Sequence, residues 1–160
     1  MAKHKDESSP QTPRATNRKA WHEYQILEKL ECGLELTGSE VKSIRAGNVR
    51  IEEAYAKIRG GELYLVGANI AQYPQALPNT QHEPTRERKL LAHRRQILQI
   101  EAHVKQKGKT LIPLAIYFKG GHAKCEIGVA VGKKQYDKRQ DAKKRDHQRE
   151  MTREMRRRNR

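Results

Sequence analysis

The sequence predicts a mainly β protein: a small antiparallel barrel with short flanking helices and a basic C-terminal tail. Apolar residues alternate with polar ones along several segments, which is the pattern of half-buried strands. Glycine pairs separate some of these segments and mark tight turns. Positive charge collects after Gly132, where glycine and proline no longer occur.

Size and charge limit the possible functions. The chain has 160 residues, 35% of them apolar, which suffices for one modest core but not for two domains. Its 34 Lys and Arg exceed its 19 Asp and Glu, and the resulting net charge of +15 favours a polyanionic partner. No apolar run is long enough to cross a bilayer, and the N-terminus lacks the apolar stretch of a secretory signal. We therefore expect a cytoplasmic protein without membrane contact.

The charge divides the chain into three parts. Residues 133–160 hold 13 Lys or Arg against 5 Asp or Glu, a net charge of +8, and are predicted to be a tail. Residues 1–20 carry a net charge of +3 and two prolines among small polar side chains, so we expect a flexible leader. Residues 21–132 have a net charge of only +4 and are predicted to be the globular body.

The first three strands follow from alternation and turn residues. Tyr24, Ile26, Glu28 and Leu30 share one face of the first predicted strand. The second and third strands lie around 54–58 and 63–69 and are separated by Gly60-Gly61, so we expect a hairpin.

The last two strands lie near the end of the body. The fourth, 110–118, is nearly all apolar but contains Pro113, which predicts an edge position or a bulge. The fifth, 123–131, follows the turn Gly120-Gly121 and alternates cleanly, with Cys125 as a small core residue.

Two helices are expected between the strands. Ser39 is predicted to cap a short helix that Gly47 ends. The second helix is predicted from Thr85, as N-cap, to about Gly108, with a break near 94–96 as an alternative. Its apolar residues repeat every seven positions and form one stripe: Leu90, Leu91, Ile97, Leu98 and Val104. Most of its basic residues are expected on the other side: Arg86, Arg88, Lys89, Arg94 and Arg95. Short antiparallel strands with a helical insertion favour an OB-type barrel, a fold that often binds nucleic acid.

Recognisable catalytic motifs are missing from the sequence. There is no phosphate-binding glycine motif, no HExxH spacing among the seven histidines and no carboxylate pair in an apolar context. Glu52-Glu53 comes closest, but neighbours on a strand point to opposite faces. Cys32 and Cys125 form neither a disulfide framework nor a CxxC zinc motif. We expect no enzyme, no cofactor and no metal.

The stretch from Glu31 to Gly47, ECGLELTGSEVKSIRAG, closely resembles the signature of small protein B, the bacterial tmRNA-binding (SsrA-binding) protein of trans-translation. Further matches follow in the family's order and spacing: Asn17-Arg18-Lys19, His22-Glu23-Tyr24, Gly67-Ala68-Asn69-Ile70, Arg88-Lys89-Leu90-Leu91, Gly132-Lys133-Lys134 and Asp137-Lys138-Arg139.

The resemblance implies an RNA-binding adaptor rather than an enzyme. Its body would bind the tRNA-like domain of tmRNA and accompany it to stalled ribosomes for ribosome rescue. Its tail would enter the decoding centre and the empty mRNA channel of the small subunit. Alanyl-tRNA synthetase and elongation factor Tu would be reached indirectly, through tmRNA, and we expect the protein to be a monomer.

The resemblance also implies which residues bind tmRNA: Asn17, Arg18, Lys19, His22, Tyr24, Glu31, Gly33, Lys42, Arg45, Asn69, Lys89, Leu91 and Lys124. Asn17, Glu31 and Asn69 suit hydrogen bonds to base edges or 2′-hydroxyls. Lys42, Arg45, Lys89 and Lys124 suit phosphates, and His22 and Tyr24 suit stacking on unpaired bases. On pattern alone, Tyr24 and Leu91 are core residues, and Glu31 is a solvated carboxylate or a partner of Lys29 or Lys42.

The tail is predicted to be disordered when free and helical when bound to RNA. Its Asp141–Arg145 and Glu154–Arg158 pairs favour a helix, but its few apolar residues offer little to dock against the body. The residues implied in ribosome binding are Gly132, Lys133, Lys134, Tyr136, Asp137, Lys138, Arg139, Lys143, Lys144, Arg145 and Arg153. The family pattern has an aromatic or histidine side chain at position 136. Tyr136 keeps an aromatic ring but, unlike histidine, cannot become a cation near neutral pH.

Two other readings compete with the adaptor. A structural ribosomal protein or general RNA chaperone would also carry a basic tail, but the spaced family motifs weigh against it. An RNA-processing enzyme would need an acid–base or metal cluster that the sequence does not display.

Overall fold

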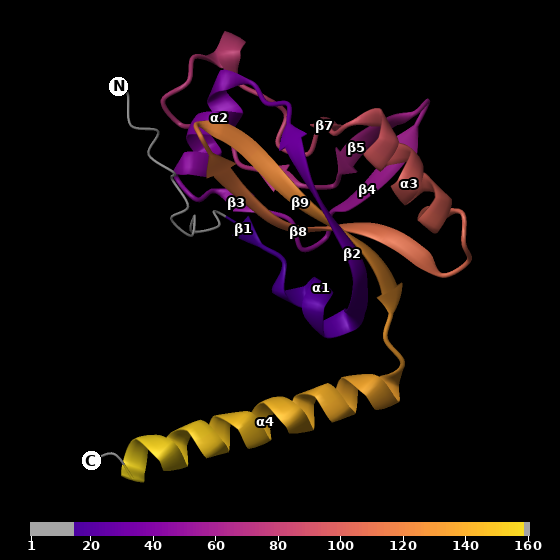
Figure 1. Ribbon diagram of the computed structural model, residues 1–160. Helices are drawn as coiled ribbons and strands as arrows, with labels where there is room; N and C mark the ends of the chain where they lie inside the picture. Colours follow the sequence, from indigo (N-terminus) through magenta and orange to yellow (C-terminus); the bar gives the residue numbers. More distant parts are fainter. Residues whose placement is uncertain (1–14, 159–160) are drawn as a thin grey trace, which may run out of the picture.

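The computed structural model describes residues 15–158 and shows a closed antiparallel β-barrel (Figure 1). Six strands form it: β2 (Tyr24–Leu34), β4 (Tyr55–Arg59), β5 (Glu62–Val66), β7 (Arg88–Leu91), β8 (Lys109–Lys119) and β9 (His122–Gly132). Their order is β8–β4–β5–β7–β2–β9, and β9 pairs again with β8, so the sheet closes on itself. The predicted fold class, a mainly β OB-type barrel with flanking helices, is confirmed.

The remaining elements flank the barrel. β1 (Ala15–Thr16) pairs with β8, whereas β3 (Val49–Arg50) and β6 (Asn69–Ile70) form a separate two-stranded sheet. The helices are α1 (Arg18–Glu23), α2 (Gly38–Arg45), α3 (Arg94–Val104) and α4 (Gln135–Arg158), with one 3-10 turn at Pro78–Thr80.

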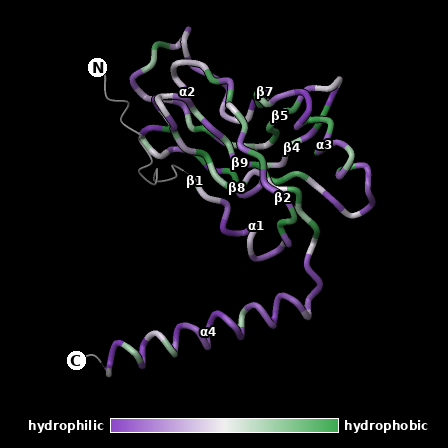
Figure 2. The backbone as a smooth tube through the Cα atoms, in the orientation of Figure 1, coloured by the Kyte–Doolittle hydropathy of each residue, from purple (hydrophilic) through white to green (hydrophobic). Residues whose placement is uncertain are grey.

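The apolar residues form two clusters. The larger one fills the barrel and includes Leu63, Leu65, Ile116 and Ile127, all fully buried. A smaller one, with Ala20, Ile112, Leu114 and Ala130, includes residues of α1, β8 and β9. Figure 2 shows the hydrophobic residues concentrated along the strands, whereas α4 is hydrophilic over most of its length.

The predicted strands are present, but their bounds differ: the third, expected around 63–69, ends at Val66, and β6 begins separately at Asn69. The first begins at Tyr24 as predicted but continues to Leu34. Gly60 and Gly61 adopt positive φ angles of 60° and 74° in the tight turn of the β4–β5 hairpin. The register between β8 and β9 shifts between Pro113 and Ala115, so the proline lies at a bulge, one of the two predicted positions.

The long helix predicted from Thr85 to Gly108 is wrong in its first half. Arg88–Leu91 is strand β7, and the helix begins only at Arg94, close to the alternative break. Strand alternation places Arg88 and Leu90 inside the barrel, while Leu91 is 51% exposed. The seven-residue repeat therefore combined a strand with a helix, and Arg88, expected on a basic outer face, is fully buried.

The short helix α2 begins two residues earlier than predicted. Its N-cap is Thr37 rather than Ser39, and the Thr37 backbone N–H donates to Glu40 Oε2 at 2.8 Å. Ser39 is buried and its hydroxyl lies 2.9 Å from Nδ1 of His82. Gly47, with φ of 82°, follows the helix end as predicted.

The two ends of the chain differ in part from expectation. Of the predicted leader, residues 1–14 lie outside the described residues, while residues 15–20 form β1 and the start of α1. The tail is a continuous helix, α4, that extends away from the barrel (Figure 1), whereas we expected disorder in the free protein. Its freedom from glycine and proline, with Asp137 in the first turn, accounts for the helix. No helix among residues 15–158 has the length and hydrophobicity needed to cross a membrane.

Candidate nucleic-acid interface

Three of the residues implied in RNA binding form a row across the outer face of the barrel. Leu91 of β7 lies opposite Gly33 of β2, Gly33 lies opposite Lys124 of β9, and Lys124 lies opposite Tyr117 of β8. Directly opposed residues of antiparallel strands point to the same face, so these four residues share the outside of the sheet. We call this set, together with Glu31 two positions along β2, the outer row.

The glycine in the outer row permits a close approach. A Cβ atom at Gly33 would lie 3.1 Å from Cβ of Leu91, so any side chain there would press against the leucine. Leu91 itself is 51% exposed and is a surface residue, not the core residue that the pattern alone suggested. The row thus presents an apolar side chain beside bare backbone, next to the Lys124 cation.

Glu31 is held by two residues of β8. Its carboxylate accepts a hydrogen bond from the Tyr117 hydroxyl and lies 3.2 Å from Nζ of Lys119, so neither Lys29 nor Lys42 is its partner. The Tyr117 hydrogen bond is the main reason why the pKa of Glu31 lies below its usual value; burial opposes it, and Lys119 and Lys124 add to it. Glu31 is therefore a carboxylate at neutral pH, with its side chain 38% exposed.

An aromatic and charged cluster adjoins the outer row. Lys29 of β2 lies 3.5 Å from Glu126 of β9, and its Nζ is 4.8 Å from the centre of the Trp21 ring. Glu126 is directly opposite Glu31 across the two strands.

Lys89 lies on β7 beside a groove of about 510 Å³ that Leu91, Arg94 and Leu98 also line. Its ammonium contacts Glu62 at 2.6 Å, and the Tyr64 hydroxyl donates to the same carboxylate at 2.7 Å. The Lys89 ammonium is already paired in the structure, and this ion pair raises its pKa.

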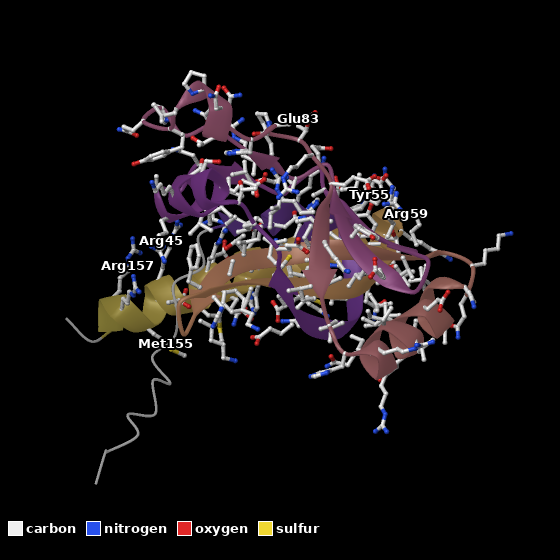
Figure 3. The ribbon with its side chains drawn as sticks, turned by 90° about the horizontal axis from the view of Figure 1, so that it is seen from above. Arg45, Tyr55, Arg59, Glu83, Met155 and Arg157 are labelled. Carbon is white, nitrogen blue, oxygen red and sulfur yellow. The ribbon has the colours of Figure 1, made fainter. Side chains whose placement is uncertain are left out.

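A second group of implied residues lies on and near α2. Lys42 and Arg45 are exposed, and each lies over an aromatic ring, Tyr73 at 5.7 Å and Phe118 at 5.3 Å. Asn69 is exposed on β6, where it lines a groove of about 290 Å³ with Arg50. Figure 3 shows Arg45 on the opposite side of the barrel from Arg59 and Tyr55.

The third group belongs to α1, and one of its members is buried. Asn17 is 1% exposed; its Oδ1 accepts from the Ala20 backbone N–H at 2.9 Å, and its Nδ2 donates to the carbonyls of Pro113 and Ile51. This asparagine caps α1 and fastens it to β8, so its side chain offers no free group at the surface. Arg18, the Glu53-paired Lys19 and His22 are exposed, whereas Tyr24 is half-buried beside the smaller apolar cluster.

Lys133 joins the tail to the body. Its Nζ donates to the Trp21 carbonyl at 3.1 Å and to Asp141 Oδ2 at 2.5 Å, and its backbone N–H donates to the Glu23 carbonyl at 2.9 Å. The ammonium is the main cause of the lowered pKa of Asp141. This lysine, implied in ribosome binding, is 15% exposed and links the end of α1 to α4.

Most other implied tail residues are exposed. Tyr136 is 69% exposed, Lys138 is half-buried, and the following residues are exposed: Gly132, Lys134, Asp137, Arg139, Lys143, Lys144, Arg145 and Arg153. One stretch of the α4 surface is lined by Arg145, Gln148, Arg149, Thr152, Arg153 and Arg156, with no acidic residue among them. The described residues include no side-chain partner for these arginines other than a long 3.9 Å contact between Arg149 and Asp146.

A buried ion cluster ties α2 to β7, and we did not expect it from the sequence. Glu40 accepts from Nε of Arg88 at 2.9 Å and from Nε and Nη2 of Arg86 at 2.7 Å each. Burial favours the neutral form of Glu40, but the bonds from Arg86, the Thr37 N–H and Arg88 outweigh it and lower the pKa to about 2. The remaining donors of Arg88 reach backbone carbonyls, among them those of Ala68 and Pro84.

Sequence reasoning missed Tyr117 and Lys119 as members of the candidate interface. The sequence gives no clear signal for them, because 110–118 is nearly all apolar and its pattern does not single out Tyr117 as an outward-facing residue. Residues 15–158 contain no group of three or more His, Cys, Asp or Glu placed to hold a metal ion. Cys32 and Cys125 are free and buried, directly opposite each other in β2 and β9.

Known proteins resemble this chain over most of its length. The SsrA-binding protein of Carboxydothermus hydrogenoformans is 50% identical over 142 residues, 89% of this chain and 95% of the relative. The SsrA-binding protein of Salinispora arenicola is 55% identical over 139 residues, 87% of each chain. A chain in a solved structure of tmRNA–SmpB and the bacterial ribosome is 45% identical, with a TM-score of 0.64, covering 75% of this chain and 84% of that one. The family model described as SmpB protein matches residues 14–157. Because this model and the relatives above match most of its length, the chain belongs to the SmpB protein family.

Proposed function

We propose that this chain is an RNA-binding adaptor of trans-translation, which binds the tRNA-like domain of tmRNA and promotes its delivery to stalled ribosomes. Its membership of the SmpB family supports this, as do relatives that are SsrA-binding proteins. A chain that is 45% identical to this one belongs to a solved structure of tmRNA–SmpB and the bacterial ribosome. This similarity supports the ribosome as a partner.

The outer row is the observation that carries the proposal. Leu91, Gly33, Lys124 and the Glu31 carboxylate come from three strands and meet on one exposed face. A cation, an ionised acceptor and an apolar side chain are what a folded RNA loop requires, because phosphates, 2′-hydroxyls and unpaired bases each find a partner. A uniform basic patch would lack the acceptor and the apolar contact.

The other exposed implied residues extend this interface in the proposal. Lys42 and Arg45 contact phosphates, and their charged groups are positioned over the Tyr73 and Phe118 rings. Asn69 takes a base edge or 2′-hydroxyl, and Arg18, Lys19 and His22 contact RNA around α1. Asn17 acts indirectly, since it holds α1 in place.

We further propose that α4 enters the decoding centre and the vacant mRNA channel. Its arginine-lined, acid-free surface suits the phosphates of ribosomal RNA, and the exposed Tyr136 ring suits stacking on a base. In this scheme residues 21–132, together with β1 and the start of α1, recognise tmRNA and residues 133–160 act on the ribosome. Alanyl-tRNA synthetase and elongation factor Tu meet the protein only through tmRNA, and the protein acts as a monomer without catalysis.

Competition binding tests the recognition step. The full chain is bound to a labelled tRNA-like domain of tmRNA and challenged with the same unlabelled domain or with an unrelated hairpin of equal length. We expect the hairpin to compete poorly. Equal competition by both RNAs would favour the alternative, a structural ribosomal protein or general RNA chaperone. Cleavage of the RNA during incubation would contradict the non-enzymatic role.

The Lys124→Gln variant tests whether the outer row contacts phosphate. We expect weaker binding to the tRNA-like domain and a salt dependence reduced by about one phosphate contact. Lys107→Gln, which removes the same charge from an exposed loop position, is the control and should bind as the wild type does. Equal effects of the two substitutions would place the contact elsewhere.

A triple substitution tests the tail. Arg145, Arg149 and Arg153 are changed to Gln, which preserves helix-forming residues while it removes three charges. We expect near wild-type binding to the tRNA-like domain but loss of peptide tagging on stalled ribosomes. Truncation after Gly132 should have the same two effects, because it removes none of the described core residues. Three matched changes at Lys105, Lys107 and Lys109 should leave tagging intact. Normal tagging by the tail variant would remove the role proposed for α4.

A further inference from the structure

One partner of Glu31 is a neutral hydroxyl on another strand. Tyr117 donates to Oε2, while Nζ of Lys119 lies 3.2 Å from Oε1 and 3.4 Å from Oε2. Both partners belong to β8, on the far side of β9 from Glu31. The carboxylate therefore reaches across β9 and is fixed at its tip, and its remaining lone pairs stay available.

The protonation states of the pair are well defined. Burial, followed by the bond to Glu31, raises the pKa of Tyr117, so its hydroxyl is a donor at neutral pH. The same bond is the main cause of the low pKa of Glu31. The charged groups that surround this carboxylate are Lys119 on β8, and Lys124 and Glu126 on β9. A fixed, ionised acceptor is thus built into a surface that also carries the Lys119 and Lys124 cations.

We propose that Tyr117 is a positioning residue of the RNA interface, which holds the Glu31 carboxylate ready to accept hydrogen bonds from RNA donors. This inference rests on the proposed function. A free glutamate side chain on a strand samples several rotamers, and ordering it on binding costs free energy. The tyrosine hydroxyl removes part of that cost in advance, so affinity is gained without a direct contact between Tyr117 and RNA.

The hydroxyl of Tyr117 can be tested separately from its ring. Tyr117 is half-buried, and its hydroxyl bonds an exposed carboxylate rather than a core group, so Tyr117→Phe keeps the packing of the ring. Urea unfolding should give nearly the same stability as for the wild type. Tyr55→Phe is the matched control, because it removes a hydroxyl that bonds none of the described residues from a 46% exposed side chain.

The decisive experiment is a double-mutant cycle for binding to the tRNA-like domain. The full chain is compared with Tyr117→Phe, Glu31→Gln and the double variant. We expect Tyr117→Phe to bind about fivefold more weakly, the size of one ordinary hydrogen bond. Added to Glu31→Gln, the same substitution should have almost no further effect, because there is no carboxylate left to position. Tyr55→Phe should bind as the wild type does.

A measurement without RNA separates this inference from the proposed function. NMR titration of the Glu31 side-chain carboxyl should show a higher pKa in Tyr117→Phe than in the wild type, since the hydrogen bond to the ionised form is gone. An unchanged pKa, wild-type affinity of Tyr117→Phe, or a loss that persists in full in the Glu31→Gln background would each overturn the positioning role. If instead the wild type fails to prefer the tRNA-like domain over the hairpin, the proposed function fails while the titration still reports on the pair.

Discussion

Replacing Glu40 by Gln should destabilise the protein strongly, although the two side chains have almost the same shape. Glu40 and Arg88 are both fully buried, and the substitution leaves the Arg88 charge without its counter-ion. Breaking a buried ion pair in this way typically costs about 3 to 5 kcal/mol. The pKa of Glu40 gives a second measure, because lowering it from 4.5 to about 2 on folding corresponds to about 3 kcal/mol of stability at neutral pH.

Urea unfolding at pH 7, followed by tryptophan fluorescence, measures this effect. Trp21 is the only tryptophan, and it belongs to α1 beside the barrel, so the signal reports on the body rather than on α4. We expect the free energy of unfolding to fall by about 3 kcal/mol without a change in the denaturant slope. Glu53→Gln is the control, because it breaks the ion pair with Lys19 at the surface, where Glu53 is 80% exposed. Its effect should be far smaller.

The pH dependence follows from the sign of the shift. The folded pKa of Glu40 lies below its unfolded value, so the contribution is fully present above about pH 4.5 and is lost as the pH falls towards 2. The stability difference between wild type and Glu40→Gln should therefore narrow over this window. A difference below about 1 kcal/mol at pH 7, or one that stays constant down to pH 2, would refute the reasoning.

Three further predictions concern the barrel surface and the tail. Gly33→Ala should weaken RNA binding and cost about 1 kcal/mol of stability, since the new methyl group would lie 3.1 Å from Cβ of Leu91, an atom that no rotamer change moves. Gly128→Ala should cost about 1 to 3 kcal/mol by urea unfolding, because its Cβ would lie 3.0 Å from a buried leucine. Asp141→Asn should broaden the barrel-to-α4 distance distribution measured with paired labels, because Lys133 loses its partner on α4.

Each of these predictions has a result that contradicts it. If Gly33→Ala binds RNA with wild-type affinity, Leu91 is not part of the interface. If Gly128→Ala leaves the free energy of unfolding unchanged, the smaller apolar cluster can accommodate an additional methyl group. For the tail, Asp146→Asn is the control with the same loss of charge, since among residues 15–158 the one ion-pair partner of Asp146 is Arg149 of its own helix, at 3.9 Å. A distance distribution broadened equally by both substitutions would show that Lys133 does not orient α4.

The strands were predictable because their alternation reflects which side of the barrel each residue faces. β7 was not, because it is only four residues long and contains Arg88, a charged residue in an inward position. A prediction from alternation assigns every charged residue to the exposed face of a strand. It is wrong for a charged residue that is buried with an oppositely charged partner. The partner, Glu40, lies 48 positions earlier in the chain, so no local pattern reveals the pair.

The candidate site shows the same limit. The family resemblance implied Glu31, Gly33, Leu91 and Lys124, and strand pairing brings all four to one face. The motifs also indicated Asn17, which the structure buries as the cap of α1. A family motif does not show whether a residue contacts RNA directly or holds the surrounding structure in place. Only the tertiary structure distinguishes these two roles. Tyr117 could not be selected from the sequence, since its hydrogen bond to Glu31 spans 86 positions.

The helical state of α4 also sets a length scale. As a helix, its 24 residues span about 36 Å, whereas the same residues fully extended would span about 80 Å. A helix that starts at Gln135 therefore holds its last turn at one fixed distance from its first turn, while an unfolded chain would sample many distances. In the proposed function, a tail folded in this way would fix how far beyond the tmRNA-binding body the protein reaches into the ribosome.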